Sequence, residues 1–244
     1  MSGELDGRVA MVTGGAGRLG RAISTELARE GAAVGVFEAR ADAGADVAKA
    51  IRASGGRSAS ATGDVSRAGE VEAAVEQLER ELGPIDVLVN AHGIFPNRPV
   101  LEMDDEEWDR VFAVNTRGTM FACRAVARRL VERGAPGAIV NISSGAATSA
   151  RAGAAHYNGS KAAVNQLTLV LDDVLHEGDA HASEYVNLML RGTPLRRTGS
   201  PADIAPAVVF LASDRSPWTT GAILEISGGS HTGRPHVPLS RGLR

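Results

Sequence analysis

Short apolar runs alternate with longer amphipathic segments along most of the chain. Residues 8–13 (RVAMVT) are apolar and are followed by glycine, which predicts a short buried strand. In residues 20–30 the apolar side chains Ile23 and Leu27 stand four positions apart, which is helical spacing. By the same criteria we expect further strands at 33–37, 57–61, 85–89, 138–142 and 222–226, and further helices at 42–53, 66–82, 106–133, 157–175 and 201–212.

Local signals refine two of these helices. Ser66 is expected to be the N-cap of the helix that follows it, and Gly83-Pro84 should stop that helix. The long segment 106–133 is expected to be one helix with a bend near Gly118. Trp108 is expected to pack this helix against the core.

The alternation of strands and helices predicts the fold class. Strands joined by helices form a parallel sheet that is covered by helices on both faces. We therefore expect a doubly wound α/β fold in a single domain, residues 1–229, followed by a tail at 230–244. In such sheets ligands bind at the carboxyl ends of the strands, so the chemistry should lie just after each strand.

Composition and charge exclude several classes of protein. Hydrophobic residues make up 43% of the 244, and the net charge is only −3 with no long run of one sign, so nucleic-acid binding is not indicated. The one cysteine, Cys123, cannot form an intramolecular disulfide. No signal peptide is visible and no apolar stretch reaches the length of a membrane span. We expect a cytoplasmic protein without a nucleic-acid or membrane partner, and we assign no metal site.

A glycine-rich turn, residues 13–20 (TGGAGRLG), follows the first predicted strand. The backbone N–H groups of such a turn can approach a pyrophosphate, and the N-terminus of the next helix adds a favourable dipole. Any tight turn can be rich in glycine, but the position directly after the first strand favours nucleotide binding.

The second predicted strand ends near Glu38, and this residue bears on the choice of coenzyme. A carboxylate there can accept hydrogen bonds from both ribose hydroxyls of NAD and would repel the 2′-phosphate of NADP. Glu38 could instead be a plain surface carboxylate, and Arg40 two residues later could favour a phosphate. The sequence predicts NAD in preference to NADP.

Four polar residues form the most specific pattern. Tyr157 and Lys161 are four apart on a predicted helix, so they share one face. A lysine ammonium lowers the pKa of a nearby phenol, which can then act as a general base on an alcohol or as an acid toward a ketone. Ser144, 13 residues before Tyr157, follows a predicted strand and could hold the substrate oxygen. Asn115 completes the set.

These features together resemble the short-chain dehydrogenase/reductase superfamily. The resemblance runs from Gly7 to about Gly229. The matching pieces are TGGAGRLG at 13–20, Glu38, Asp64-Val65, NAHG at 90–93, Asn115, ISS at 142–144, YNGSK at 157–161 and PADIAPAVVFLAS at 201–213. The resemblance implies a Rossmann-like fold and an oxidoreductase that transfers a hydride between NAD(H) and an alcohol or ketone.

The resemblance also implies a role for each matching residue. Tyr157 would be the catalytic acid or base, Lys161 would bind the nicotinamide ribose, Ser144 would orient the substrate oxygen, and Asn115 would hold a water of a proton relay. Asp64 and Val65 would contact the adenine, and Ser143 would be structural. The coenzyme would be bound by Gly14, Arg18, Leu19, Gly20, Glu38, Asp64, Val65, Asn90, Gly93, Tyr157 and Lys161. The family also implies a homodimer or homotetramer.

Two residues depart from the family pattern near the expected coenzyme site. Arg18 stands where the family usually has glycine, and its guanidinium could bond the pyrophosphate or a 2′-phosphate. His92 lies in the segment that usually reads NNAG. Its imidazole could contact coenzyme or substrate, or it could be a packed side chain with satisfied hydrogen bonds.

A third departure concerns the segment after Leu175, which is short for the family. In one alignment residues 185–190 are the expected inner strand and the substrate-covering lobe is lost. In the other, residues 183–190 end the lobe's helix and the strand is missing, which would leave neighbouring backbone groups unpaired. Both alignments shorten the substrate lobe, so a catalytically impaired coenzyme-binding or scaffold protein is the alternative to an active enzyme.

Smaller features leave further alternatives. Arg124, Arg128 and Arg129 form a basic stripe that could grip an acidic acyl-carrier protein, although a solvated helix face or a subunit contact is the simpler interpretation. His156 could line the substrate pocket or face outward. The sequence does not name the substrate beyond an alcohol or ketone.

Overall fold

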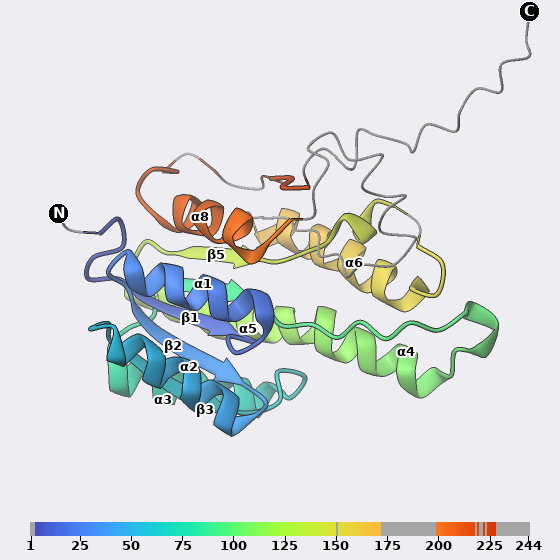
Figure 1. Cartoon of the computed structure of the whole chain (residues 1–244), viewed down its shortest axis with the longest axis horizontal. Helices are drawn as coiled ribbons and strands as arrows, with labels where there is room; N and C mark the ends of the chain where they lie inside the picture. The colour runs from blue at the N-terminus through green and yellow to red at the C-terminus, as the bar shows by residue number, and fades with distance from the viewer. Residues whose placement is uncertain are drawn as a thin grey trace, which may run out of the picture.

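The computed structural model describes residues 3–149, 151–171, 199–217, 219, 222 and 224–227. Within these residues, five parallel strands form a sheet in the order β3-β2-β1-β4-β5 (Figure 1). The strands are β1 (Val9–Thr13), β2 (Ala33–Glu38), β3 (Ser58–Thr62), β4 (Val87–Asn90) and β5 (Ala138–Asn141). The strand order reverses at β1, which places the topological switch point between β1 and β4.

β1 and β2, which both lie in the interior of the sheet, are buried on both faces. Every residue of β1 and β2 is buried, and Val12 of β1 lies in register with Val36 of β2 and Val89 of β4. Strands covered on both faces carry near-continuous apolar runs rather than an alternating pattern. This is why the short apolar runs in the sequence identify the strands.

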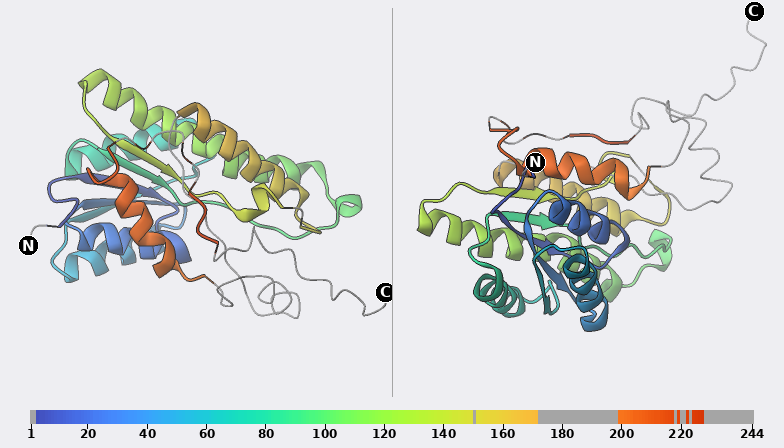
Figure 2. Two further views of the ribbon diagram at one scale, coloured as in Figure 1. Left: turned by 90° about the horizontal axis from the view of Figure 1, so that it is seen from above. Right: turned by 60° about the vertical axis from the view of Figure 1, so that its left-hand side comes forward.

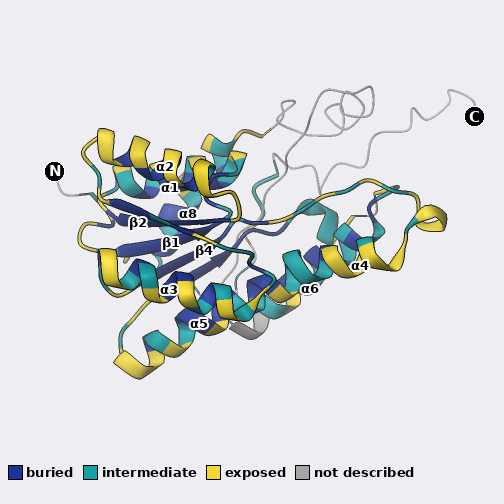
Figure 3. Ribbon diagram, turned by 90° about the horizontal axis from the view of Figure 1, so that it is seen from below, coloured by how far each residue is buried: buried dark blue, intermediate teal, exposed yellow. Residues whose placement is uncertain are grey.

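Helices cover both faces of the sheet (Figures 1 and 2). α1, α2 and α8 pack on one face, and α3 and α5 pack on the other. α6 lies alongside α5 (Figures 2 and 3). The helices are α1 (Arg18–Arg29), α2 (Ala41–Ala53), α3 (Ala68–Leu82), α4 (Asp105–Phe112), α5 (Gly118–Arg133), α6 (Ala155–Leu171) and α8 (Pro201–Ala212).

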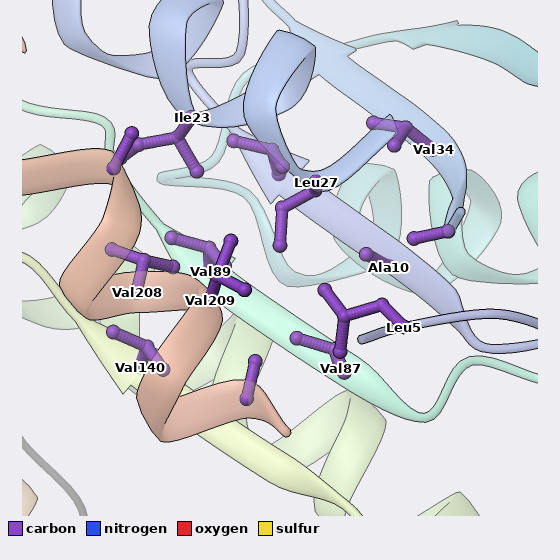
Figure 4. Close-up of a cluster of buried hydrophobic side chains, with 14 of the residues drawn as sticks. Leu5, Ala10, Ile23, Leu27, Val34, Val87, Val89, Val140, Val208 and Val209 are labelled. Atoms are coloured by element: carbon purple, nitrogen blue, oxygen red, sulfur yellow. The ribbon is translucent and has the colours of Figure 1, made fainter. Parts of the chain in front are cut away.

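The core between the sheet and α1 joins segments that are far apart in the sequence. Ile23 and Leu27 of α1 meet Val208 and Val209 of α8 over Val89 of β4 (Figure 4). These side chains are at most 5% exposed. Burying one such side chain stabilises the fold by about 1.5–3 kcal/mol, so this contact holds α8 against the sheet. Figure 3 shows β1, β2 and β4 buried along their length, with exposed residues along the outer sides of the helices.

The long helix predicted at 106–133 contains an irregular segment. α4 passes into a π-helical segment, Ala113–Arg117, and α5 begins at Gly118. Helical backbone thus runs from Asp105 to Arg133, and a π segment lies directly before Gly118, the place where a bend is expected. Asn115 lies inside this segment and is fully buried. Such π segments frequently occur at functional sites.

The predicted N-cap at Ser66 is wrong. α3 begins at Ala68 with Arg67 as its N-cap. The backbone N–H and the hydroxyl of Ser66 instead donate to Asp64 Oδ1, at 2.8 and 2.7 Å. Hydrogen bonds to an ionised carboxylate are stronger than those between neutral groups, so Ser66 belongs to the turn before the helix.

The expectation that Trp108 packs on the core is also wrong. Its side chain is 42% exposed and stacks on Phe112 with ring centroids 5.1 Å apart. Figure 1 shows α4 extending past the strands, so this helix has no sheet beneath it. The two rings, four positions apart on one helix face, cover each other instead.

Several predictions fall outside the described residues. These are the end of the helix predicted at 157–175, the segment at 183–190 with its two alignments, and the tail at 230–244. The strand predicted at 222–226 is described only in part, with Leu224 as a single bridge residue. In the described part of the chain, no helix combines the length and apolar character needed to cross a membrane.

His92 ties the loop after β4 to β1 and to the π segment. Its Nδ1 lies 2.6 Å from Thr13 Oγ1, and its Nε2 lies 3.2 Å from the Val114 carbonyl and 3.3 Å from Thr119 Oγ1. Burial, aided by the positive charge of Lys161, lowers the pKa of His92 to about 3, although the bond to Val114 opposes this. His92 is thus a packed, neutral imidazole with bonded ring nitrogens, as the second interpretation of its position states. It also lines a cavity at the carboxyl edge of the sheet, so its contact with a coenzyme stays a prediction.

Arg129 of the basic stripe holds α5 to α3. Its guanidinium donates to Glu72 Oε2 at 2.9 Å and to Glu79 Oε2 at 3.1 Å. Arg124 and Arg128 are exposed. The stripe therefore divides into one structural residue, which is 20% exposed at its side chain, and two exposed residues on the outer face of the helix.

We expect Arg129→Met to lower the free energy of unfolding by about 1–2 kcal/mol, because two partly buried carboxylates lose a charged donor. Urea denaturation of the purified protein measures this. Arg128→Met is the matched control and should change stability by less than about 0.5 kcal/mol. Equal effects of the two substitutions would contradict the assignment of a structural role to Arg129.

The buried, neutral His92 should make stability depend on pH. Below about pH 6.5 the unfolded chain binds a proton at His92, whereas the folded chain binds it only near pH 3. Between these values the free energy of unfolding should fall as the pH falls, by up to about 1.4 kcal/mol per pH unit from this group. Urea denaturation from about pH 7.5 to about pH 5 should show a shallower dependence in His92→Gln than in the unaltered chain. Identical slopes would contradict the low pKa.

Candidate active site

A cavity of about 410 Å³ opens at the carboxyl edge of the sheet, beside the switch point. Segments that follow β1, β2, β3 and β4 line it, together with the end of α4 and the start of the π segment. This is where an open α/β sheet binds its ligand. Of the residues that the sequence predicts for coenzyme binding, the lining includes Gly14, Glu38, Asp64, Val65 and Gly93.

The glycine-rich turn brings the loops after β1 and β4 together at the switch point. Gly14 has a φ of 62°, and a Cβ added to it would lie 2.6 Å from His92 Cα. A Cβ on Gly20 would lie 2.1 Å from the Gly14 carbonyl oxygen. Arg18 is exposed at the start of α1, and Leu19 packs against the core. The described residues that line the cavity do not include Arg18, Leu19 or Gly20, so the predicted coenzyme contacts of these three stay a prediction.

Glu38 is held in place by the backbone of two turns. Its Oε2 accepts from the Ala16 N–H at 3.2 Å and its Oε1 from the Arg40 N–H at 3.4 Å, and the side chain is nearly buried. Arg40 Nε lies 3.7 Å from Oε1, while most of its own side chain is exposed. A carboxylate can accept about four hydrogen bonds, so two backbone donors leave acceptor sites for the hydroxyls of a ribose.

Asp64 stands at the far wall of the same cavity. Burial raises the pKa of its carboxyl, but hydrogen bonds from Ser66 and the positive charges of Arg67 and Arg110 outweigh this, so the pKa lies below its ordinary value. Asp64 is therefore an ionised acceptor at neutral pH. Arg110 also lines the cavity, from α4, and no motif in the sequence indicates this position.

Lys161 enters the site from α6 as a buried cation. It is 4% exposed, and its Nζ donates to the Ile142 carbonyl at 2.8 Å. A Cβ placed on Gly93 would lie 3.6 Å from Lys161 Nζ and 3.3 Å from Asn115 Oδ1. The structure thus brings Lys161, Asn115 and Gly93 together where the loop after β4 leaves the sheet.

Asn115 fastens this loop to α6. Its Oδ1 accepts from the Ile94 N–H at 2.8 Å, and its Nδ2 donates to the Ile94 carbonyl and to Ser160 Oγ, both at 3.0 Å. Ser160 Oγ in turn donates to the Tyr157 carbonyl at 2.8 Å. Three of the four hydrogen bonds that an asparagine amide can make are therefore used within the protein.

The tandem serines after β5 have different surroundings. Ser143 is buried and its hydroxyl donates to the Lys161 carbonyl at 3.2 Å, which agrees with the structural role predicted for it. Ser144 is half-buried, in extended backbone, and its Oγ accepts from the Ala146 N–H at 3.2 Å at the start of a short 3-10 turn, Gly145–Ala147. That turn packs against α6, so Ser144 and Tyr157 come to the same edge.

Tyr157 lies in the first turn of α6, half-buried. Its ring is 4.5 Å from the ring of Phe95, at an interplanar angle of 60°. Phe95 is 41% exposed, and the Arg151 guanidinium lies 4.6 Å above its face. The loop after β4 thus supplies an aromatic neighbour for Tyr157, which the sequence analysis did not identify.

Asn90 is buried beneath the site and does not reach the cavity among the described lining residues. Its Nδ2 donates to Asn141 Oδ1 at 2.8 Å, and Asn141 Nδ2 donates to Thr168 Oγ1 at 3.1 Å, so β4, β5 and α6 are cross-linked by side chains. Cys123 Sγ lies 3.3 Å from Asn90 Nδ2. Burial raises the pKa of the Cys123 thiol to about 12, which keeps it protonated and unreactive.

The interpretation that His156 faces outward is wrong, whereas the interpretation that it lines the substrate pocket stays a prediction. It is fully buried, its Nε2 lies 3.2 Å from Glu107 Oε1, and its Nδ1 accepts from the Tyr157 N–H at 2.8 Å. Its partner Glu107 lies 49 positions away on α4. Only the fold brings the two together, so spacing in the sequence could not reveal the pair. Within the described residues, no group of three or more His, Cys, Asp or Glu side chains is placed to hold a metal ion.

Comparison with known families covers nearly the whole chain. A family model described as short chain dehydrogenase matches residues 8–182. A second model, described as Enoyl-(Acyl carrier protein) reductase, matches residues 172–231. The sequence after α6 therefore still matches a family model, including the part that lies outside the described residues.

Individual relatives agree with the family match. The chain is 37% identical to an uncharacterized oxidoreductase of Methylorubrum extorquens, over 93% of this chain and 98% of that protein. It is 34% identical to the D-threitol dehydrogenase of Mycolicibacterium smegmatis, over 93% and 94%. The crystal structure of a gluconate 5-dehydrogenase from Burkholderia cenocepacia, in complex with NADP and tartrate, has a TM-score of 0.89 at 29% identity, over 94% of this chain and 97% of that one.

The fold, the glycine-rich turn at the switch point and these matches agree with one another. Members of the matched family are oxidoreductases that use NAD(P). The chain belongs to the short-chain dehydrogenase/reductase superfamily.

Proposed function

We propose that this protein is an NAD(H)-preferring oxidoreductase that interconverts an alcohol and a ketone. The observation that carries the proposal is the buried Lys161 ammonium, 4% exposed, one helical turn from Tyr157 and beside the coenzyme cavity. A buried cation lowers the pKa of a nearby phenol, and general acid–base catalysis needs such a group near working pH. The matching dehydrogenases support this chemistry.

The residues that line the cavity fit a dinucleotide. Gly14 leaves open backbone at the switch point, where a Cβ would collide with the next loop, and Glu38 and Asp64 present carboxylates on two sides. Lys161 would hold the nicotinamide ribose at the inner end. A nicotinamide coenzyme bound here would supply or accept the hydride.

Tyr157 would exchange the proton with the substrate oxygen. Toward a ketone the phenol donates its proton, and toward an alcohol the phenolate accepts it. Ser144 would donate a hydrogen bond to the same oxygen as charge develops. Lys161 favours the phenolate electrostatically, and the remaining lone pair of Asn115 Oδ1 would accept from a relay water. The homo-oligomer implied by the family stays a prediction.

Replacing Tyr157 by Phe tests the catalytic assignment. We expect kcat to fall at least about 100-fold, because the reaction loses its acid–base group, while the Kd for NADH changes by less than about twofold. Substrates for the assay begin with D-threitol and gluconate, for which two relatives are named. Ordinary turnover by this variant would contradict the mechanism, and absence of NADH binding by the unaltered chain would contradict the function.

The coenzyme preference follows from Glu38. We expect calorimetric titration to give tighter binding of NADH than of NADPH, because the carboxylate repels a 2′-phosphate. Glu38→Gln keeps the size of the side chain and removes the charge. The ratio of the Kd for NADPH to the Kd for NADH should therefore fall by about tenfold, which corresponds to about 1.4 kcal/mol. Asp46→Asn removes an exposed charge from α2 and should leave the ratio unchanged. A preference for NADPH in the unaltered chain, as in the relative that holds NADP, would overturn this part of the proposal.

A further inference from the structure

A hydrogen-bonded chain of three side chains, those of Arg98, Glu107 and His156, links the loop after β4 to the first turn of α6. Arg98 Nε donates to Glu107 Oε1 at 3.0 Å, and His156 Nε2 lies 3.2 Å from the same oxygen. His156 Nδ1 accepts from the Tyr157 backbone N–H at 2.8 Å. This hydrogen-bonded chain therefore ends on the backbone of Tyr157, the residue proposed as acid or base.

The chemistry of this chain fixes the tautomer of the imidazole. Because Nδ1 of His156 accepts a hydrogen bond, the ring proton of the neutral form lies on Nε2 and donates to Glu107. The hydrogen bond from Arg98 lowers the pKa of Glu107 below its ordinary value, and the bond from His156 adds to this while burial opposes it. Glu107 is thus an ionised acceptor that holds the ring in one orientation.

The N–H of Tyr157 needs a partner outside the helix. The first hydrogen bond of α6 runs from the Asn158 N–H to the Ala154 carbonyl at 2.8 Å. The N–H groups that precede it in the first turn have no acceptor within the helix. The fully buried His156 imidazole supplies this acceptor. It therefore has the role that a capping side chain has at other helices.

The same loop also contacts the side-chain end of Tyr157. The ring of Phe95 lies 4.5 Å from the ring of Tyr157, and the Arg98 N–H donates to the Gly153 carbonyl at 2.8 Å, just before α6. The loop after β4 therefore contacts the start of α6 at the aromatic ring, at the backbone before the helix and, through Glu107, at His156.

We propose that His156 and Glu107 are positioning residues that hold Tyr157 in its working place relative to Lys161. The proposal rests on the proposed function for its kinetic consequence, but the placement itself can be measured without turnover. Neither residue touches the coenzyme cavity among the described lining residues. Misplacing a reacting group by about 1 Å can cost about 100-fold in rate, so a modest shift of α6 is enough to matter.

Four substitutions separate the parts of this hydrogen-bonded chain. His156→Leu removes both ring nitrogens. His156→Asn places an amide oxygen close to where Nδ1 lies, so it can still accept from the Tyr157 N–H. Glu107→Gln keeps an acceptor for Nε2–H and serves as the mild control, and Glu107→Ala removes that acceptor.

The first readout is the ionisation of the Tyr157 phenol, followed by ultraviolet absorbance. The chain has two tyrosines, so a Tyr185→Phe background leaves Tyr157 as the one titrating phenol. In that background we expect a midpoint below the value of about 10 for a free phenol, because of Lys161. His156→Leu should move the midpoint upward, toward about 10, whereas His156→Asn and Glu107→Gln should leave it nearly unchanged.

The second readout is steady-state kinetics. We expect kcat to fall by about tenfold in His156→Leu with the KM for NADH within about twofold, and His156→Asn to recover most of the loss. An unchanged midpoint and kcat in folded His156→Leu, or equal losses in the Leu and Asn variants, would overturn the proposal. If His156→Leu does not fold, Glu107→Ala takes its place. An unchanged midpoint and kcat in Glu107→Ala, or losses equal to those in Glu107→Gln, would then overturn the proposal. If the unaltered chain turns over no substrate, the proposed function fails while the phenol titration still decides the placement.

Discussion

Lys161 carries an ammonium group into the interior at the carboxyl edge of the sheet, where its Nζ donates to the Ile142 carbonyl at 2.8 Å. Burying a charge is expensive unless polar groups surround it, so this cation constrains everything near it. Asn115 Oδ1 and the open backbone of Gly93 come close to it, and its positive charge helps to keep His92 neutral. Asn115 and Gly93 thus lie beside both the buried lysine and the wall of the cavity.

The π segment serves the same end. Placed between α4 and α5, it brings the Asn115 amide to the loop after β4, where that amide bonds both the N–H and the carbonyl of Ile94 and also reaches Ser160 on α6. The π segment thus supplies hydrogen-bond partners that the backbone of the loop would otherwise lack. A regular helix through residues 113–117 would have a different register, and the three elements would lose their common contact.

The sequence predicts what depends on local pattern. Buried strands such as 8–13 are visible as apolar runs, and a glycine at position 14 or 20 is visible because any side chain there would collide with backbone. Features set by distant partners are not visible. Ser66 looks like an N-cap until the carboxylate of Asp64 takes its donors. Trp108 looks like a core residue until α4 is seen to extend past the sheet. The pairing of His156 with Glu107 is not visible in the sequence, because Glu107 comes from α4.

The same distinction applies within the proposed catalytic pair. A spacing of four guarantees that Tyr157 and Lys161 share one face of α6, since this follows from helical geometry alone. It does not fix where that face points. The direction depends on the start of the helix. There Phe95 packs on the ring of Tyr157, and His156 accepts from its backbone N–H. Phe95 lies in the loop after β4, and His156 is linked to that loop through Glu107 and Arg98. Because that loop also lines the coenzyme cavity through Gly93 and Ile94, one segment sets the positions of both the phenol and the cavity wall. The geometry between the Tyr157 phenol and the cavity is therefore a property of the fold, and the sequence motif supplies only the groups that the fold arranges.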